Sequence, residues 1–113
     1  MFRKSETVGT LGEFEALVLA SVLAAGQDAY GAMIHEEIEG LVSGSRDVSL
    51  GSVYTTLDRL EQKGYLKSWT GEPTAERGGR AKRYYEVQAS GQRALRAALE
   101  PMKRAWEIVQ GSV

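Results

Sequence analysis

The chain has 113 residues, of which 42% are hydrophobic, and a formal net charge of −1. This length supports one hydrophobic core with a short appendage rather than two independent folding units. The sequence has no cysteine, which excludes disulfides and thiolate metal sites. It also has no apolar run long enough to span a bilayer and no signal-peptide pattern at the start, which favours a cytoplasmic protein without a membrane partner.

The first predicted element is a helix over residues 11–25, with about two to four residues of latitude at each end. Glu13 and Glu15 lie in its first turn, where the helix dipole favours acidic side chains. Gly26 is the expected stop signal. The predicted buried side is apolar at helical spacing and consists of Leu11, Phe14, Leu17, Val18 and Val22.

A second helix is predicted after the linker at residues 26–29, with Asp28 as its N-cap. Residues 43–45 break this helix, and Asp47 and Val48 are expected to form a very short strand. The apolar side of the second helix consists of Tyr30, Met33, Ile34, Ile38 and Leu41.

The third predicted helix begins after Ser49, as its N-cap, and ends at Gly64. Leu50, Val53, Leu57 and Leu60 recur at helical spacing and are expected to bury one side. The opposite side is small and polar, and a DNA major groove admits such a face closely. An ordinary solvated helix face is the alternative. The candidate DNA-contacting residues here are Ser49, Gly51, Ser52, Tyr54, Thr55, Thr56, Arg59 and Lys63.

Two strands are predicted next, over residues 65–70 and 82–87, joined by a polar segment with glycine and proline. Trp69 is expected to pack on the strands, and Tyr84 and Tyr85 to face opposite sides. The cations around the glycine tip are suited to contacts with the DNA backbone or the minor groove. The alternative is that they only make the hairpin soluble, and Arg83 could instead pair within the fold. These cations are Arg77, Arg80, Lys82 and Arg83.

The charge is unevenly distributed along the chain. Residues 46–83 hold eight Lys and Arg against five Asp and Glu, whereas residues 1–45 hold two against seven. Affinity for a polyanion depends on local cations, so the near-neutral total is compatible with a localised nucleic-acid footprint.

From Ser90 onward, helical periodicity returns with an apolar stripe that the preceding elements do not need. A tryptophan on a terminal amphipathic helix would be unusually exposed in a monomer, which predicts burial in a dimer. Pro101 predicts either a bend or the start of a new helix. The stripe predicted to form a dimer or ligand interface consists of Leu95, Leu99, Met102, Trp106 and Val109.

No catalytic constellation is present, and an enzyme is not expected. The chain has one histidine, His35, which lies among Glu36, Glu37 and Glu39. Without a second histidine or a cysteine, a solvated charged helix face is favoured over a metal site. We expect neither a metal nor a cofactor.

Residues 49–60, 64–66, 77–87 and 89–91 together resemble the PadR family of bacterial transcriptional regulators, and the likeness spans roughly residues 11–110. The resemblance implies homodimeric winged-helix repressors that dimerise through the C-terminal helix, some binding small aromatic molecules between subunits. Leu50 and Thr55 stand where the family often has prolines, so no operator sequence is carried over.

The expected fold is mainly α with a small β-hairpin: a winged helix-turn-helix in residues 1–88 and a C-terminal dimerisation helix in residues 89–113. The expected function is repression by a homodimer that binds double-stranded DNA at an inverted repeat. A small aromatic effector that releases the DNA is a further hypothesis. The alternative is a winged-helix protein-interaction module without DNA binding, which the acidic first segment favours.

Overall fold

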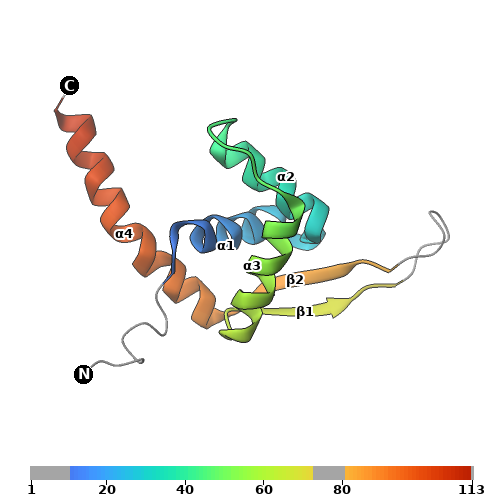
Figure 1. The fold of residues 1–113 in the computed structure, drawn as a ribbon. Helices are drawn as coiled ribbons and strands as arrows, with labels where there is room; N and C mark the ends of the chain where they lie inside the picture. The colour runs from blue at the N-terminus through green and yellow to red at the C-terminus, as the bar shows by residue number, and fades with distance from the viewer. Residues whose placement is uncertain (1–10, 73–80, 113) are drawn as a thin grey trace.

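The computed structural model describes residues 11–72 and 81–112. This part of the chain is mainly helical with one antiparallel hairpin, as the sequence predicts (Figure 1). In chain order the elements are α1 Glu13–Ala25, the 3-10 turn η2 Gly26–Asp28, α2 Gly31–Val42, α3 Leu50–Gln62, β1 Leu66–Thr70, β2 Arg83–Val87 and α4 Ala89–Gly111.

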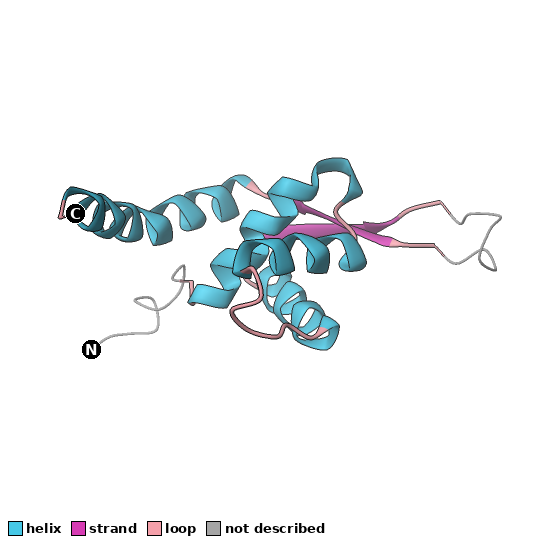
Figure 2. Ribbon diagram, turned by 90° about the horizontal axis from the view of Figure 1, so that it is seen from above, coloured by secondary structure: helices cyan, strands magenta, loops and turns pink. Residues whose placement is uncertain are grey.

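Helices α1, α2 and α3 pack together around one hydrophobic core, against which the hairpin and the start of α4 also pack. Burial of the apolar side of each helix is the main source of stability in such a core. Figure 2 shows the hairpin and the second half of α4 extending from opposite sides of the helices. The largest fully buried apolar side chains are Val18, Leu19, Ile34, Ile38, Val53, Leu57 and Leu60.

The start of α2 differs from the prediction. Asp28 lies in η2, and the N-cap of α2 is Tyr30, whose side chain makes no capping hydrogen bond. Tyr30 is extended because its backbone forms an isolated antiparallel bridge with Tyr84, while the Tyr85 N–H donates to the Ala29 carbonyl at 2.9 Å. The edge of β2 therefore pairs with residues just before α2. The strand predicted at Asp47 and Val48 is wrong, because these residues form a loop.

The hairpin brings Trp69 opposite Tyr84 and Ser68 opposite Tyr85. Tyr85 is buried in the core, whereas Tyr84 is half-buried, which confirms that these neighbours face opposite sides of the strand. Gly64, with φ +83°, makes the sharp turn between α3 and β1.

Helix α4 begins against the turn that leads into β1. The Ser90 hydroxyl donates to the Gly64 carbonyl at 2.9 Å, and the Gln88 N–H donates to the Tyr65 carbonyl at 2.8 Å. Gly91 lies so close to the Tyr65 carbonyl that a side chain would collide with it. These contacts set the direction in which α4 leaves the core.

Helix α4 continues through Pro101 as a single helix, so no new helix starts there. Its second half extends beyond the core (Figure 1). Within the described ranges, no helix combines the length and the apolar character that crossing a membrane would require.

Candidate nucleic-acid interface

The first turn of α3 is held by short hydrogen bonds between its own residues. Ser49 is the N-cap, as predicted: its hydroxyl accepts from the Ser52 N–H at 3.0 Å. The Ser52 hydroxyl donates to the Ser49 carbonyl at 2.9 Å, and the Thr55 hydroxyl donates to the Gly51 carbonyl at 3.0 Å. Because these hydroxyls fold back on the backbone, the exposed side of the helix is low and smooth.

Gly51 is the lowest point of this exposed side. A Cβ built there would meet no atom within 4 Å, and the φ of Gly51 does not lie in the left-handed region. Neither crowding nor backbone strain within the chain therefore requires a glycine at this position. A glycine that is not needed for folding is typical of sites where another backbone or a ligand approaches closely.

Tyr54 reaches from α3 to the start of α2. Tyr54 is 43% exposed, and its hydroxyl lies against Gly31, the first residue of α2, where a Cβ would collide with it. The predicted contact of this hydroxyl with a phosphate stays a prediction. The hydroxyl lies beside the first turn of a helix that has no side-chain cap, where unpaired N–H groups favour anions.

Two positions of α3 differ from the prediction in their burial. Thr56, expected on the outer face, is only 4% exposed, and Leu50, expected in the core, is 42% exposed. Thr56 lies between Val53 and Leu60 on the helix surface and is covered with them, since residues three and four apart share a face. Leu50 is the first residue of α3 and shares a face with Val53 and Leu57, but it is only partly covered there. Thr56 is therefore not a surface residue for DNA.

Lys63 is engaged within the chain. Its ammonium group lies 2.9 Å and 3.1 Å from the two carboxylate oxygens of Glu15 on α1. One of these oxygens also accepts from the Gly12 N–H at 2.9 Å. Lys63 thus neutralises a mostly buried carboxylate. It is exposed at the end of α3, as predicted, but its ammonium group is engaged within the chain.

The surroundings of Glu15 affect its acidity in opposing ways. Burial would raise the pKa of Glu15, but hydrogen bonds from Gly12 and Lys63, together with the charges of Lys63 and Arg59, outweigh it. The pKa of Glu15 therefore lies below the usual value of 4.5. The carboxylate is ionised at neutral pH and ties α1 to the end of α3.

At the base of the wing, aromatic rings connect the hairpin to α2. Trp69 stacks on Tyr84 at a centroid distance of 6.1 Å, and Tyr84 meets the Tyr30 ring edge-on at 5.6 Å. The Lys82 ammonium lies 4.2 Å from the centroid of Tyr30, a cation–π contact. Arg83, at the first position of β2, is exposed. The predicted wing residues Arg77 and Arg80 lie outside the described residues.

Sequence reasoning missed two residues near this face. The Nε2 atom of His35 lies 2.6 Å from the Val48 carbonyl oxygen, and the ring is only partly exposed. His35 therefore holds the loop that precedes α3, rather than lying on a fully solvated face as predicted. Asp58 is exposed on α3 one turn after Tyr54, so the outer face also carries a negative charge. The acidic pattern around His35 gave no signal of its long-range partner.

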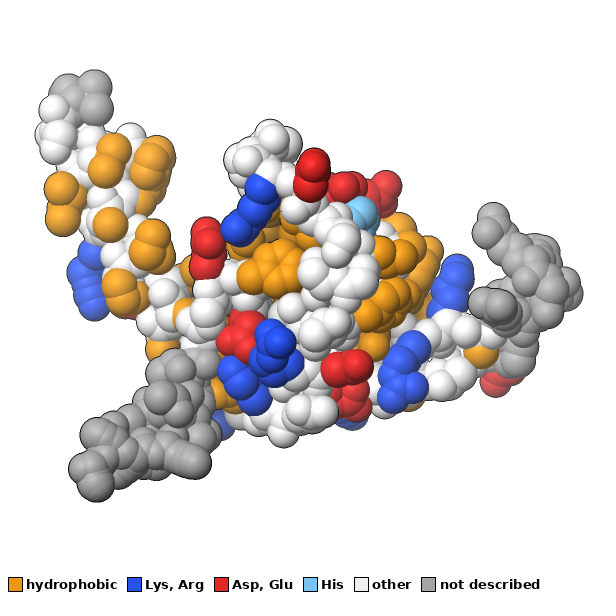
Figure 3. Space-filling view, in the orientation of Figure 1, with side chains coloured by type: hydrophobic (Ala, Val, Ile, Leu, Met, Phe, Trp, Pro, Cys, Tyr) orange, Lys and Arg blue, Asp and Glu red, His pale blue; other side chains and the backbone are white. Residues whose placement is uncertain are grey.

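The surface over α3 is largely uncharged in Figure 3, with Lys and Arg side chains near one end of the helix and along the hairpin. Within residues 11–72 and 81–112, no group of acidic, histidine or cysteine side chains is arranged to hold a metal ion.

The apolar stripe of α4 divides into two parts. Leu95 is 6% exposed because it packs in the core of its own chain, so it offers little surface to the predicted interface. Beyond it, large side chains remain exposed and form the α4 stripe of this chain: Leu99, Met102, Trp106, Ile108 and Val109. Figure 3 shows hydrophobic groups along this projecting half of the helix.

Comparison with protein families identifies the transcriptional regulator PadR-like family, whose model matches residues 18–97. The chain belongs to the PadR-like family. The match includes the helix-turn-helix, the hairpin and the buried start of α4, and it ends before Leu99, so most of the exposed α4 stripe lies outside it. A search of curated proteins found no match.

Solved structures with the same fold include further regulators. A transcriptional regulator from Clostridium thermocellum has a TM-score of 0.68 and 20% identity, covering 100% of this chain and 99% of that one. A PadR family transcription regulator from hypervirulent Clostridium difficile has a TM-score of 0.57 and 24% identity, covering 89% and 94%. These similarities establish the PadR-like winged-helix fold with its C-terminal helix.

A third structure is the ORC1 protein of Aeropyrum pernix in complex with DNA. It matches this PadR-like chain with a TM-score of 0.65 and 27% identity over 90% of this chain. The matched region makes up 28% of the ORC1 chain. The likeness therefore concerns one part of that larger protein.

Proposed function

We propose that this PadR-like protein is a cytoplasmic transcriptional repressor that binds an inverted-repeat operator as a homodimer. In this proposal α3 enters the major groove, and the wing contacts the backbone or the minor groove. Small aromatic molecules that bind at the dimer seam would release the DNA. The protein would not be an enzyme.

The observation that carries the proposal is the exposed side of α3 around Gly51. An alanine would favour the helix by up to about 1 kcal/mol and would meet no other atom, so folding does not account for the glycine. Close approach of a groove wall does account for it. Ser52 and Thr55 keep acceptor lone pairs beside it, since each hydroxyl uses its proton within the helix.

The remaining predicted contacts divide by role. Ser49 and Tyr54 are proposed to contact phosphates, as are the wing cations Arg77, Arg80, Lys82 and Arg83. Arg59 is exposed on α3 and is proposed to contact the backbone or a base edge. The ORC1 structure in complex with DNA supports nucleic acid as the partner of this fold.

The exposed α4 stripe supports the homodimer. Leu95, Leu99, Met102, Trp106 and Val109 are separated by four, three, four and three residues, which is the spacing of a coiled-coil seam. In the part of the chain that the structure describes, four of these five side chains are between 45% and 63% exposed. A second α4 carries the same apolar seam and would bury these side chains by two-fold symmetry. Trp106 would then lie at the seam, where an aromatic effector could stack.

A footprinting experiment on the DNA upstream of the protein's own gene, at physiological salt and with competitor DNA, tests the proposal. We expect protection of an inverted repeat whose half-site centres are about one helical turn, or a multiple of it, apart. Two results together would favour the protein-interaction module instead. The protein would protect no operator sequence in preference to competitor DNA, and it would capture a partner protein that the Ser52→Tyr variant no longer binds. The exposed Asp58 is the structural feature that favours this alternative.

A further inference from the structure

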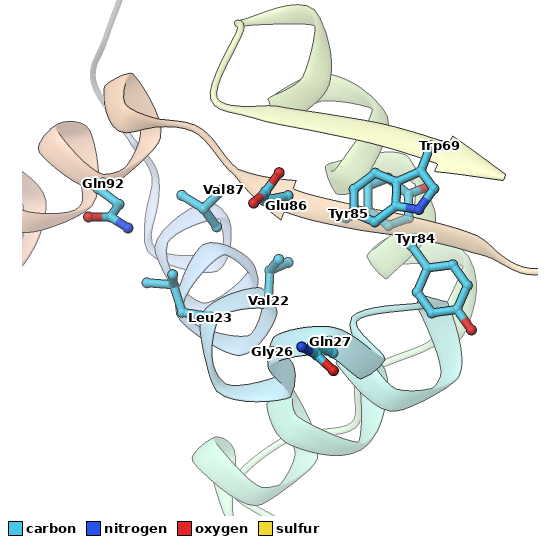
Figure 4. Close-up of a pocket in the computed structure, with 10 residues that line it drawn as sticks. All are labelled: Val22, Leu23, Gly26, Gln27, Trp69, Tyr84, Tyr85, Glu86, Val87 and Gln92. Carbon is cyan, nitrogen blue, oxygen red and sulfur yellow. The ribbon is translucent and has the colours of Figure 1, made fainter. Parts of the chain in front are cut away.

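A hollow of about 460 Å³ lies between the end of α1, the hairpin and the first turn of α4. Figure 4 shows Trp69 and Tyr84 at one end of the hollow, Gln92 at the other, and Leu23 of α1 between them. This volume is in the range of sites that hold small organic molecules. The hollow is separate from the α4 stripe, because none of the stripe residues lines it.

The apolar surface of the hollow is suited to a flat molecule. Trp69 and Tyr84 are stacked with an angle of 18° between their rings, and Trp69 remains 46% exposed. Leu23, also 46% exposed, is a second large apolar side chain in the lining. A planar aromatic ring that covers the indole and the leucine would remove both from water, and flat rings stack favourably on tryptophan.

The charge of the lining selects the kind of ring. Glu86 is the one charged residue that the described lining contains, and no lysine or arginine is among the lining residues. The Glu86 carboxylate pairs with Lys67 across the hairpin at 3.5 Å, but both side chains are more than half exposed, so this pair is weak. A ligand cation would gain both this carboxylate and the face of Trp69, whereas an anion would find no cation among the lining residues.

We propose that this hollow binds planar aromatic cations of two or three rings, at a site distinct from the dimer seam around Trp106. The Gln27 and Gln92 amides at the rim supply polar groups for ring substituents. Binding at this site needs no DNA and no second chain, so the proposed ligand site can be tested independently of the proposed repressor function.

Tryptophan fluorescence tests the proposal, because the chain has two tryptophans and Trp106→Phe leaves Trp69 as the single indole. The probe is 9-aminoacridine, which is a three-ring cation at neutral pH, and the comparison probe is the anion anthracene-9-carboxylate. We expect 9-aminoacridine to quench Trp69 emission saturably in the DNA-free protein. The anion should bind at least about tenfold more weakly.

Leu23→Arg places a cation in the hollow at an exposed helix position and should weaken 9-aminoacridine binding about tenfold or more. Leu41→Arg on α2, where leucine is 53% exposed and outside the hollow, is the matched control and should leave binding unchanged. Calorimetric titration of 9-aminoacridine into the Trp69→Ala and Trp106→Ala variants locates the site independently of fluorescence. Circular dichroism verifies that both variants are folded.

Three results would overturn the proposal: no saturable quenching up to the solubility limit of the probe, equal binding of the anion, or binding that persists in Trp69→Ala and is lost in Trp106→Ala. The last result would assign the probe to the α4 seam. Weakening by Leu23→Arg and Trp69→Ala, with unchanged binding in Leu41→Arg and Trp106→Ala, would establish the hollow as the site.

Discussion

Gly51 lies in the first turn of α3 with open space where a side chain would be. Because alanine is the better helix former, Gly51→Ala should leave the free energy of unfolding unchanged or raise it by up to about 1 kcal/mol. If a groove wall approaches this backbone, the same change should weaken operator binding about tenfold or more by displacing that wall. Thermal unfolding and fluorescence anisotropy with labelled operator DNA measure the two effects.

The matched control for this change is Gly40→Ala. Gly40 is also an exposed helical glycine with no atom within 4 Å of an added Cβ, but it lies on α2, away from the proposed DNA face. The control should show the same effect on stability and unchanged DNA affinity. Equal DNA affinities for the two variants would contradict close approach at Gly51.

Glu15 and Lys63 provide a second test at a single residue. We expect Glu15→Gln to lower the free energy of unfolding by about 1–3 kcal/mol at neutral pH, because charged hydrogen bonds to Gly12 and Lys63 are weakened. Since the folded-state pKa of Glu15 is below 4.5, its contribution is complete above about pH 4.5 and is lost as the pH falls through the folded-state value. Urea unfolding at a series of pH values measures this difference.

Glu13→Gln is the control. Glu13 lies in the same turn, but its side chain is 78% exposed and its ion pair with Arg46, at 3.6 Å, is at the surface. An exposed pair contributes little, so the control should unfold almost as the parent protein does. A Glu15→Gln deficit that stays constant well below pH 4.5 would show that packing rather than charge accounts for it.

At the scale of elements, the turn between α2 and α3 is held by His35. The Val48 carbonyl accepts from Nε2 of the His35 ring, and Val48 directly precedes the N-cap Ser49. We expect His35→Leu to lower the free energy of unfolding by about 1–2 kcal/mol, because it leaves this carbonyl, on a buried residue, without its partner. Hydrogen exchange of the amides in the first turn of α3 should become faster.

His35→Gln is the rescue variant, since its side-chain amide can donate to the same carbonyl. It should recover most of the lost protection in α3. If Leu and Gln variants exchange equally fast, the hydrogen bond to Val48 does not set the position of the turn.

The elements themselves were largely predictable from local spacing. Apolar periodicity located α1, α2 and α3, Ser49 was identified as a cap, and Gly64 marked the end of α3. The start of α2 was not predictable in the same way, because the extended conformation of Tyr30 depends on pairing with Tyr84, which lies far along the chain.

At the scale of the whole molecule, removal of the exposed part of α4 tests whether this helix forms the dimer. The core includes Leu95, and Gly91 packs on Tyr65, so a truncation must keep these residues. We expect deletion of residues 99–113 to give a folded monomer that binds the operator weakly, because the apolar seam is lost while the core is kept. Light scattering over a range of concentrations measures the assembly.

Trp106→Glu tests the same seam with one substitution and should shift the protein toward monomers by burying an unpaired charge. Lys103→Glu, at an exposed position off the 4-3-4-3 spacing, should leave the assembly unchanged. Dimers that persist in both the truncated chain and Trp106→Glu would assign dimerisation to another surface.

The amino-acid sequence by itself determined the order of the four α-helices and the hairpin, the cap of α3 and the family, because local spacing and short motifs carry this information. Only the tertiary structure decided the roles of Lys63, Thr56, Leu95 and His35. Lys63 pairs with a carboxylate 48 residues away, and Leu95 is covered by elements far from it in sequence. Local spacing indicates which side of a helix a residue occupies, whereas its burial and its partners depend on what packs against that side.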